Sequence, residues 1–256
     1  MPSPARISPL VEALLFWAFA FLLLVGCSLF FGQGSITKLV VTLSFFLLPR
    51  VASTFCTSTL GHVQRVDFGL HFGSWKKELR FFFLLFLPIL ILYPLLHVAW
   101  LELQHHLAFL PFAQLQNTPI EWTFNLQFPL PPQAPFPSLF SLFPQWGWLW
   151  VIELTLDTYW VVALSEEYFY RGYLQSRLNE YWPRQTPLLK PGLWLAALLF
   201  ALGHLGHFQV ARLLVFFPAL LFGWAKEKTQ GLLCPILLHG SCNLLEMVLR
   251  ASFVQN

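Results

Sequence analysis

Charged residues are scarce in this chain. Asp, Glu, Lys and Arg make up 11% of its 256 residues, while 57% are hydrophobic. Soluble domains carry about a quarter charged residues, so this shortage excludes an ordinary water-soluble protein. The net charge of +3 is small, and the basic residues lie in short loops rather than in one run. We therefore expect no nucleic-acid partner.

Cysteine is also rare and follows no known pattern. The four cysteines, Cys27, Cys56, Cys234 and Cys242, form no CxxC pair and lie apart or within apolar stretches. Neither a disulfide scaffold nor a cysteine-ligated metal centre fits this distribution. The chain also lacks an HExxH sequence, which would place two histidine ligands and a base on one helical turn.

Long apolar runs dominate the sequence instead, with 28 Phe and 11 Trp. Runs of about 18 residues or more match the thickness of the bilayer core at about 1.5 Å per helical residue. We therefore predict an all-α fold, a polytopic transmembrane helical bundle that forms one integral membrane domain over residues 1–256. About seven spanning segments are expected, at residues 11–31, 36–55, 81–101, 147–165, 192–211, 213–225 and 231–249.

The basic residues predict the orientation of this bundle. If the N-terminus is cytoplasmic, 12 of the 15 Lys and Arg residues fall on the cytoplasmic side, and only Lys38, Arg212 and Arg250 fall on the other. Cytoplasmic loops of membrane proteins carry an excess of Lys and Arg, so this orientation is preferred. The short chain with minimal loops favours a prokaryotic plasma (inner) membrane.

The segment 102–145 has a composition of its own. It contains eight prolines and neither Lys nor Arg. Such a composition predicts an extracytoplasmic loop without regular structure. Every chemically unusual residue of the chain follows residue 146.

The stretch "SEEYFYRG" places three charged residues directly after an apolar run. Residues four apart share a helical face, so Glu167 stacks with Arg171, while Glu166 is turned away by about 100°. Glu167 and Arg171 can then neutralise each other and leave Glu166 as an unpaired carboxylate. In a poorly solvated site such a group can act as a general base. Alternatively, all three charges simply mark the membrane edge.

Two later apolar segments carry polar side chains at helical spacing. His204 follows Phe200 by four residues in "FALGH", and Asn243 follows His239 by four in "HGSCN". Charged groups at the centre of a spanning helix cost about 2.5–3.5 kcal/mol, and such side chains usually face the bundle interior. One buried histidine is commonly a packing residue. Three polar positions on three neighbouring segments, Glu166 with the two histidines, indicate a site.

The motifs "EEYFYR", "FALGH" and "HGSCN" resemble EExxxR, FxxxH and HxxxN of the CAAX-protease and bacteriocin-processing family. These are glutamic intramembrane peptidases that include the type II CAAX prenyl endopeptidase. The resemblance covers about residues 150–250, in the family's order and spacing. It implies a family-like catalytic core at residues 146–250, preceded in residues 1–145 by variable N-terminal helices. The proline-rich loop at residues 102–145 is not assigned to the family pattern. Within the core, Glu167 and Arg171 would hold Glu166, the proposed base, in position on its helix.

The resemblance also implies a reaction, the hydrolysis of a peptide bond without a covalent intermediate. Glu166 would act with His204 to position and deprotonate a water molecule. His239 and Asn243 would donate hydrogen bonds to the oxyanion, as two neutral donors on one helical face can. The expected partners are the lipid bilayer and a peptide or membrane-anchored protein substrate, with no cofactor and no metal.

Three alternatives remain open at this level. Glu166, His204 and His239 are an acceptable set of zinc ligands with an open fourth position. A catalytically silent relative could use the same pocket to hold a peptide or assist assembly. A proton-relaying transporter could also carry Glu and His, although the chain has neither an internal repeat nor paired half-helices.

The depth of the site is a further open point. Both histidines lie near the middle of their apolar segments, whereas Glu166 follows a nearly complete span. Either the helix that carries Glu166 continues through "YFYRGYLQ", or the site lies in the cytoplasmic half of the membrane.

Overall fold

The structure, a computed structural model, describes part of the chain in detail. The described residues are 7–32, 34–55, 75–106, 152–183, 190–207 and 210–252. All regular elements within these ranges are helical, which confirms the predicted all-α class. Most of the segment predicted to be an extracytoplasmic loop, residues 107–145, lies outside the described residues.

The described residues of the N-terminal half form three long helices: α1 (Pro9–Phe31), α2 (Ser35–Phe55) and α4 (Trp75–His106). α1 begins at a capped end, because the Ser8 side chain accepts a hydrogen bond from the Val11 N–H at 3.2 Å. It ends at Gly32, whose φ of 70° favours glycine. α4 continues beyond both ends of the predicted segment 81–101 and into the first residues expected to be loop.

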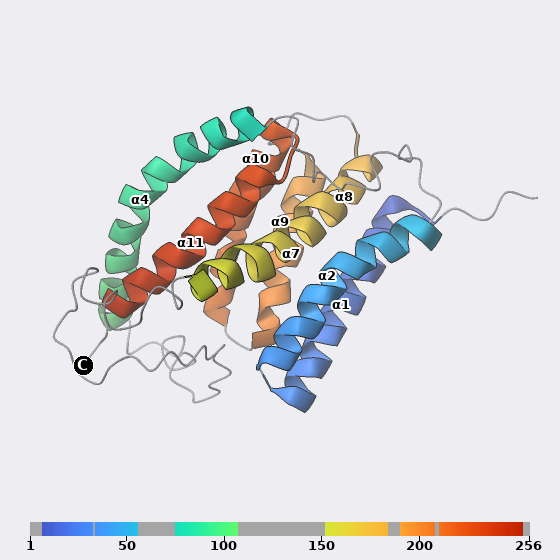
Figure 1. The fold of residues 1–256 in the computed structure, drawn as a ribbon, viewed down its shortest axis with the longest axis horizontal. Coiled ribbons are helices and arrows are strands. Elements are labelled where there is room, and N and C mark those ends of the chain that lie inside the picture. Colours follow the sequence, from blue (N-terminus) through green and yellow to red (C-terminus); the bar gives the residue numbers. More distant parts are fainter. Residues whose placement is uncertain are drawn as a thin grey trace, which may run out of the picture.

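α4 curves along its length (Figure 1). Pro88 and Pro94 lie inside this helix. Each lacks the N–H that an interior helical residue donates to the carbonyl four residues earlier, and proline in this position bends a helix. The curvature carries α4 around the outside of the bundle.

One long helix holds the first motif. After a helical start at residues 152–156 it runs through η1 (Asp157–Ala163), α7 (Leu164–Glu167), η2 (Tyr168–Leu174) and α8 (Gln175–Tyr181). η1 and η2 are π-helical, a form that often occurs at functional sites. The predicted boundary at residue 165 is wrong. The helix passes through the charged motif, where Glu167 and Arg171 form an ion pair inside the bundle.

The C-terminal part consists of α9 (Pro191–Gly203), α10 (Phe216–Thr229) and α11 (Leu233–Ser252). The two short 3₁₀ segments η3 (His204–His207) and η4 (Val210–Val215) connect α9 to α10. The α-helix within the predicted segment 192–211 is shorter than the segment, because it ends at Gly203.

The helix at residues 152–181 lies between the N-terminal pair and the C-terminal helices (Figure 1). α1 and α2 pack on one side of it, while α9 and α11 contact the other, and α4 packs on α11 at the far edge. A large core joins α1, α2, this helix and α9 around buried residues such as Phe45, Phe169 and Phe200. A second core joins α4, α10 and α11 around Phe82, Phe222 and Leu238.

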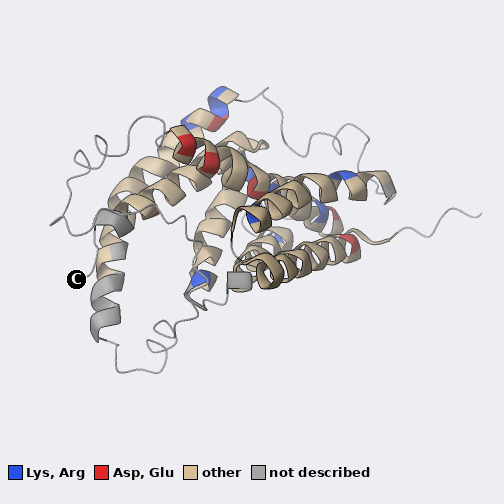
Figure 2. Cartoon of the chain, turned by 60° about the horizontal axis from the view of Figure 1, so that its bottom comes forward, with Lys and Arg blue, Asp and Glu red and all other residues tan. Residues whose placement is uncertain are grey.

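The outer surface is that of an integral membrane protein. α1, α2 and residues 75–96 of α4 are each long and apolar enough to cross a bilayer, and α9 and α11 contain shorter apolar stretches. Large side chains such as Phe30 and Phe217 are mostly exposed, at 85% and 65%. Figure 2 shows how few charged residues interrupt the helices.

Candidate active site

The two glutamates of the first motif lie at the end of α7, directly before the π-helical segment η2. This position is near the middle of the helix at residues 152–181. The structure therefore agrees with the alternative in which the helix continues through "YFYRGYLQ". Glu167 is fully buried, whereas the side chain of Glu166 is 20% exposed. The adjacent carboxyl groups thus have different surroundings.

Glu167 pairs with Arg171, as their spacing predicts. Oε1 of Glu167 lies 3.1 Å from Nη1 of Arg171, and both side chains are almost completely buried. The guanidinium also donates from Nη2 to the Ala219 carbonyl oxygen at 3.2 Å. Its Cζ lies 4.4 Å from the ring centroid of Phe200, in cation–π contact. These contacts hold the arginine in place and leave its charge opposite Glu167.

His239 lies between the two glutamates. Its Nδ1 is 2.8 Å from Oε1 of Glu167, and its Nε2 is 3.8 Å from Oε2 of Glu166. A carboxylate can only accept hydrogen bonds, so we assign the Nδ1 proton to the contact with Glu167. Nε2 is consequently the ring atom that faces Glu166. Phe222 of α10 stacks on the imidazole, with ring centroids 5.2 Å apart.

His204 lies at the end of α9 rather than within it. Its backbone caps the helix, and its Nδ1 is 2.9 Å from the carbonyl oxygen of Phe200. Phe200 contacts both motif histidines, with centroid distances of 4.6 Å to His204 and 5.9 Å to His239. Glu166 and His239 are both near enough to influence His204 electrostatically. The phenylalanine of "FALGH" therefore links all three motifs.

Asn243 follows His239 by one turn on α11 and is partly exposed. The structure therefore places Asn243 on the helical face predicted for it. Glu166, Glu167, His204 and His239 lie together, joined by the contacts described above.

Glycines in the motifs allow the site helices to approach one another closely. A Cβ atom on Gly240 would lie 3.0 Å from Cγ of Tyr159, whose hydroxyl is hydrogen-bonded to Ser241 Oγ at 2.8 Å. A Cβ on Gly203 would lie 2.6 Å from the hydroxyl oxygen of Tyr170. A larger residue at either position would move a motif histidine away from the helix that carries the glutamates.

Two buried carboxylate oxygens of the site receive no hydrogen bond from a described residue. Oε2 of Glu166 is buried, and no described residue gives it a hydrogen bond. Oε2 of Glu167 is in the same condition. Oε1 of Glu167 lies 3.1 Å from Nη1 of Arg171, whereas Oε2 of Glu166 lies 3.8 Å from Nε2 of His239. The two adjacent carboxyl groups thus differ in how closely a positive charge approaches them.

Sequence reasoning missed two residues that shape this site. Tyr159 lies before the first motif, and Phe222 lies on α10, between the second and third motifs. Each is one aromatic residue among many, so no local pattern distinguishes it. Among the residues that the structure describes, no three His, Cys, Asp or Glu side chains are arranged to hold a metal ion.

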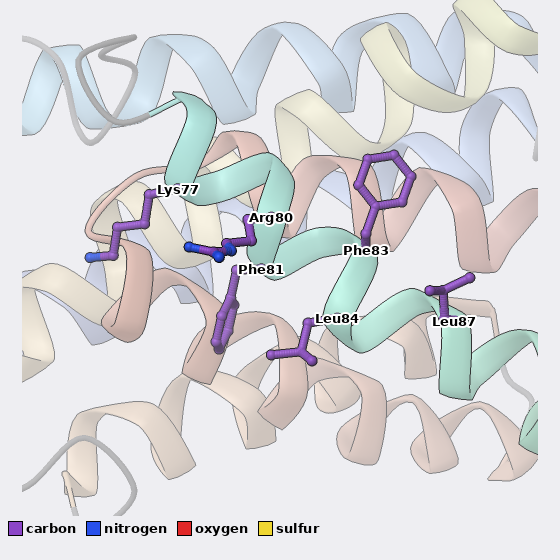
Figure 3. A pocket seen from close by; sticks show the side chains of 6 residues that line it. All are labelled: Lys77, Arg80, Phe81, Phe83, Leu84 and Leu87. Carbon is purple, nitrogen blue, oxygen red and sulfur yellow. The ribbon is translucent and has the colours of Figure 1, made fainter.

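A separate groove of about 360 Å³ lies along α4. Figure 3 shows its lining residues, which all project from α4: Lys77, Arg80, Phe81, Phe83, Leu84 and Leu87. None belongs to the three motifs. This groove is therefore distinct from the cluster of motif residues.

Comparison with known proteins agrees with the motif-based resemblance. No curated protein and no solved structure gives a significant match. Residues 145–245 match the family model described as type II CAAX prenyl endopeptidase Rce1-like. The matched residues include all three motifs. The match supports peptidase function of the CAAX-protease type at the level of the family, with a membrane-associated protein or peptide as the substrate. Residues 145–245 of this membrane protein are thus similar to the Rce1-like family of CAAX prenyl endopeptidases.

Proposed function

We propose that this protein is an intramembrane glutamic endopeptidase that uses Glu166 to activate water. The observation that carries the proposal is the placement of His239 between Glu167 and Glu166, at 2.8 Å and 3.8 Å. One glutamate is neutralised by Arg171 and holds the imidazole. The other keeps a buried oxygen without a hydrogen bond from a described residue.

In the proposed reaction, Glu166 takes a proton from a water molecule whose oxygen attacks the peptide carbonyl carbon. The new C–O bond forms as the carbonyl π pair moves onto oxygen. His239 is taken as an imidazolium, with the Nδ1 proton toward Glu167 and a second proton on Nε2. It donates from Nε2 to that oxyanion, and Asn243 donates through its amide. The C–N bond then breaks, and the amine nitrogen receives the proton held by Glu166. His204 orients the water on the other side of the carboxylate.

The proposed arrangement requires no metal and no cofactor. The zinc alternative would need Glu166, His204 and His239 as ligands. The contact of His239 Nδ1 with Glu167 leaves Nε2 available and is compatible with either role. Asn243 is a poor zinc ligand and a good hydrogen-bond donor. The same face therefore suits an oxyanion better than a coordination shell.

We further propose that residues 1–256 form one membrane domain with a cytoplasmic N-terminus in a prokaryotic plasma membrane. About seven segments would enter or cross the bilayer, counting the helix at residues 152–181 and the shorter helices α9 to α11. The distribution of Lys and Arg supports this orientation. The site would then be reached from the cytoplasmic side.

The test of this proposal is cleavage of defined peptides by the purified protein in detergent. We would compare a farnesylated peptide with a CAAX terminus, the same peptide without the lipid, and an unrelated membrane-spanning peptide. Mass spectrometry should find one internal cleavage in at least one of them. Binding without cleavage would instead favour a catalytically silent relative. Proton flux in proteoliposomes, with no cleavage, would favour a transporter.

A further inference from the structure

A buried carboxyl group on α4 lies outside the segment that matches the family model. Glu78 is fully buried, whereas its neighbours Lys77 and Arg80 are exposed on the outer side of the same helix (Figure 3). Burying a polar group is unfavourable unless its hydrogen-bonding capacity is used. The inward position of Glu78 therefore indicates a specific partner within the bundle.

That partner includes the first turn of α11. Oε2 of Glu78 accepts a hydrogen bond from the backbone N–H of Cys234 at 3.1 Å. Cys234 is the second residue of α11, and the first N–H groups of any helix lack partners within it. The next residue, Pro235, has no N–H, and the Ile236 N–H is bonded to the Leu232 carbonyl at 2.9 Å. Glu78 thus caps α11 from another helix.

The turn before α11 is shaped to admit this carboxyl group. α10 ends at Gln230, whose φ of 66° is left-handed. The following residue is Gly231, and a Cβ atom there would lie 2.6 Å from Oε2 of Glu78. Such a contact is too short for any side chain to be accommodated without movement. Gly231 is therefore what allows Glu78 to reach the helix end.

The capped end also determines where the third motif lies. His239 is five residues from Cys234 on the same helix. Its 2.8 Å contact with Glu167 forms only at one axial position and one rotation of α11. A shift by one residue moves a helical side chain by about 1.5 Å and turns it by about 100°. A fixed first turn therefore fixes the depth and the rotation of His239.

We propose that Glu78 is a positioning residue for hydrolysis, one that anchors the start of α11 so that His239 and Asn243 meet Glu166 and Glu167. This inference rests on the proposed function. It also gives the N-terminal half a part in the reaction, although that half lies outside the matched residues 145–245. Glu78 acts through α11 and has no contact with the reacting atoms.

The test compares three variants with a matched control. Glu78→Ala removes the oxygen that accepts the hydrogen bond from the Cys234 N–H, whereas Glu78→Gln keeps an acceptor oxygen. Gly231→Ala places a Cβ atom where the Glu78 carboxyl group approaches α11. The control is Glu12→Ala, because Glu12 is another buried carboxyl group of the N-terminal half, paired with Arg177 and distant in the fold from α11. Each protein is assayed for kcat and KM, thermal unfolding, and hydrogen exchange of the first turn of α11.

We expect Glu78→Ala and Gly231→Ala to lower kcat by about 10- to 100-fold with KM nearly unchanged, because misplacement of about 1 Å has effects of this size. Exchange in the first turn of α11 should become about tenfold faster, as expected for a lost cap. Glu78→Gln should keep kcat and the exchange rate of the first turn of α11 close to the wild-type values. Glu12→Ala should lower the unfolding temperature and leave α11 exchange and kcat near the wild-type values.

Unchanged exchange in Glu78→Ala would show that the cap does not hold α11. A loss of kcat that simply follows the loss of unfolding temperature, equally in Glu12→Ala and Glu78→Ala, would reduce Glu78 to a structural role. Either result would overturn the positioning role of Glu78, provided that the wild-type protein still cleaves its peptide. A wild-type protein that cleaves none of the peptides would instead refute the proposed function on which this role rests.

Discussion

The two adjacent glutamates, Glu166 and Glu167, are proposed to have different roles, which single substitutions can separate. Glu166→Gln removes the proposed base without opening a cavity, and His204→Ala removes its partner. We expect each variant to reach the membrane normally and to lose at least about 100-fold in cleavage rate, since general-base catalysis contributes roughly 10²–10⁴-fold. Quantitative mass spectrometry of the products measures the rate. Retention of more than about a tenth of wild-type activity by Glu166→Gln would remove this residue from the role.

Glu167→Gln should behave differently from Glu166→Gln. It leaves the guanidinium of Arg171 buried without its carboxylate, and breaking a buried ion pair from one side costs about 3–5 kcal/mol. We therefore expect a lower unfolding temperature as well as lost activity. Tryptophan fluorescence during heating in detergent gives the comparison. Equal unfolding temperatures of the two glutamine variants would contradict the division of roles.

At the scale of helices, the sequence predicted the contacts that depend on local spacing. The four-residue separation of Glu167 and Arg171 was enough to predict their ion pair, which the structure contains at 3.1 Å. The end of this helix was wrongly predicted because hydropathy treats Glu166 as a membrane edge, whereas the helix continues to Tyr181. The contact between His239 and Glu167 joins two helices, so no local pattern in the sequence predicts it.

The end of α10 carries a pH-dependent cluster, beyond the apolar segment 213–225. Glu227 accepts hydrogen bonds from Gln175, Asn179 and Lys190, which join α8, α10 and the start of α9. Burial alone would raise the pKa of Glu227, but the ammonium groups of Lys226 and Lys190 outweigh it and hold this pKa below its usual value.

A carboxyl group with a lowered pKa stabilises the folded state above its unfolded pKa, and this stability is lost as pH falls through the folded value. The unfolding temperature of the wild type should therefore exceed that of Glu227→Gln at pH 7, and the difference should shrink below about pH 4.5. Thermal unfolding of both proteins across this range measures the effect. A difference that stays constant would show that the charge of Glu227 contributes no stability.

At the scale of the whole molecule, composition was enough to predict an all-helical membrane protein, and the three long apolar helices agree with that class. The orientation remains a prediction from the distribution of Lys and Arg. In a cysteine-free background, single cysteines near residues 75 and 185 should be protected from an impermeant reagent added outside intact cells. A cysteine near residue 130 should react. Labelling of residue 185 from outside would reverse the orientation and the side of substrate entry.

Peptide cleavage by metal-stripped protein tests whether Glu166 activates water without a metal. The account predicts that wild-type protein treated exhaustively with a strong chelator still cleaves its peptide, and that Glu166→Gln treated in the same way does not. The reason is that the Glu166 carboxylate supplies the basicity that a metal would otherwise provide. Cleavage that disappears on chelation, and returns when stoichiometric zinc is added, would contradict the account.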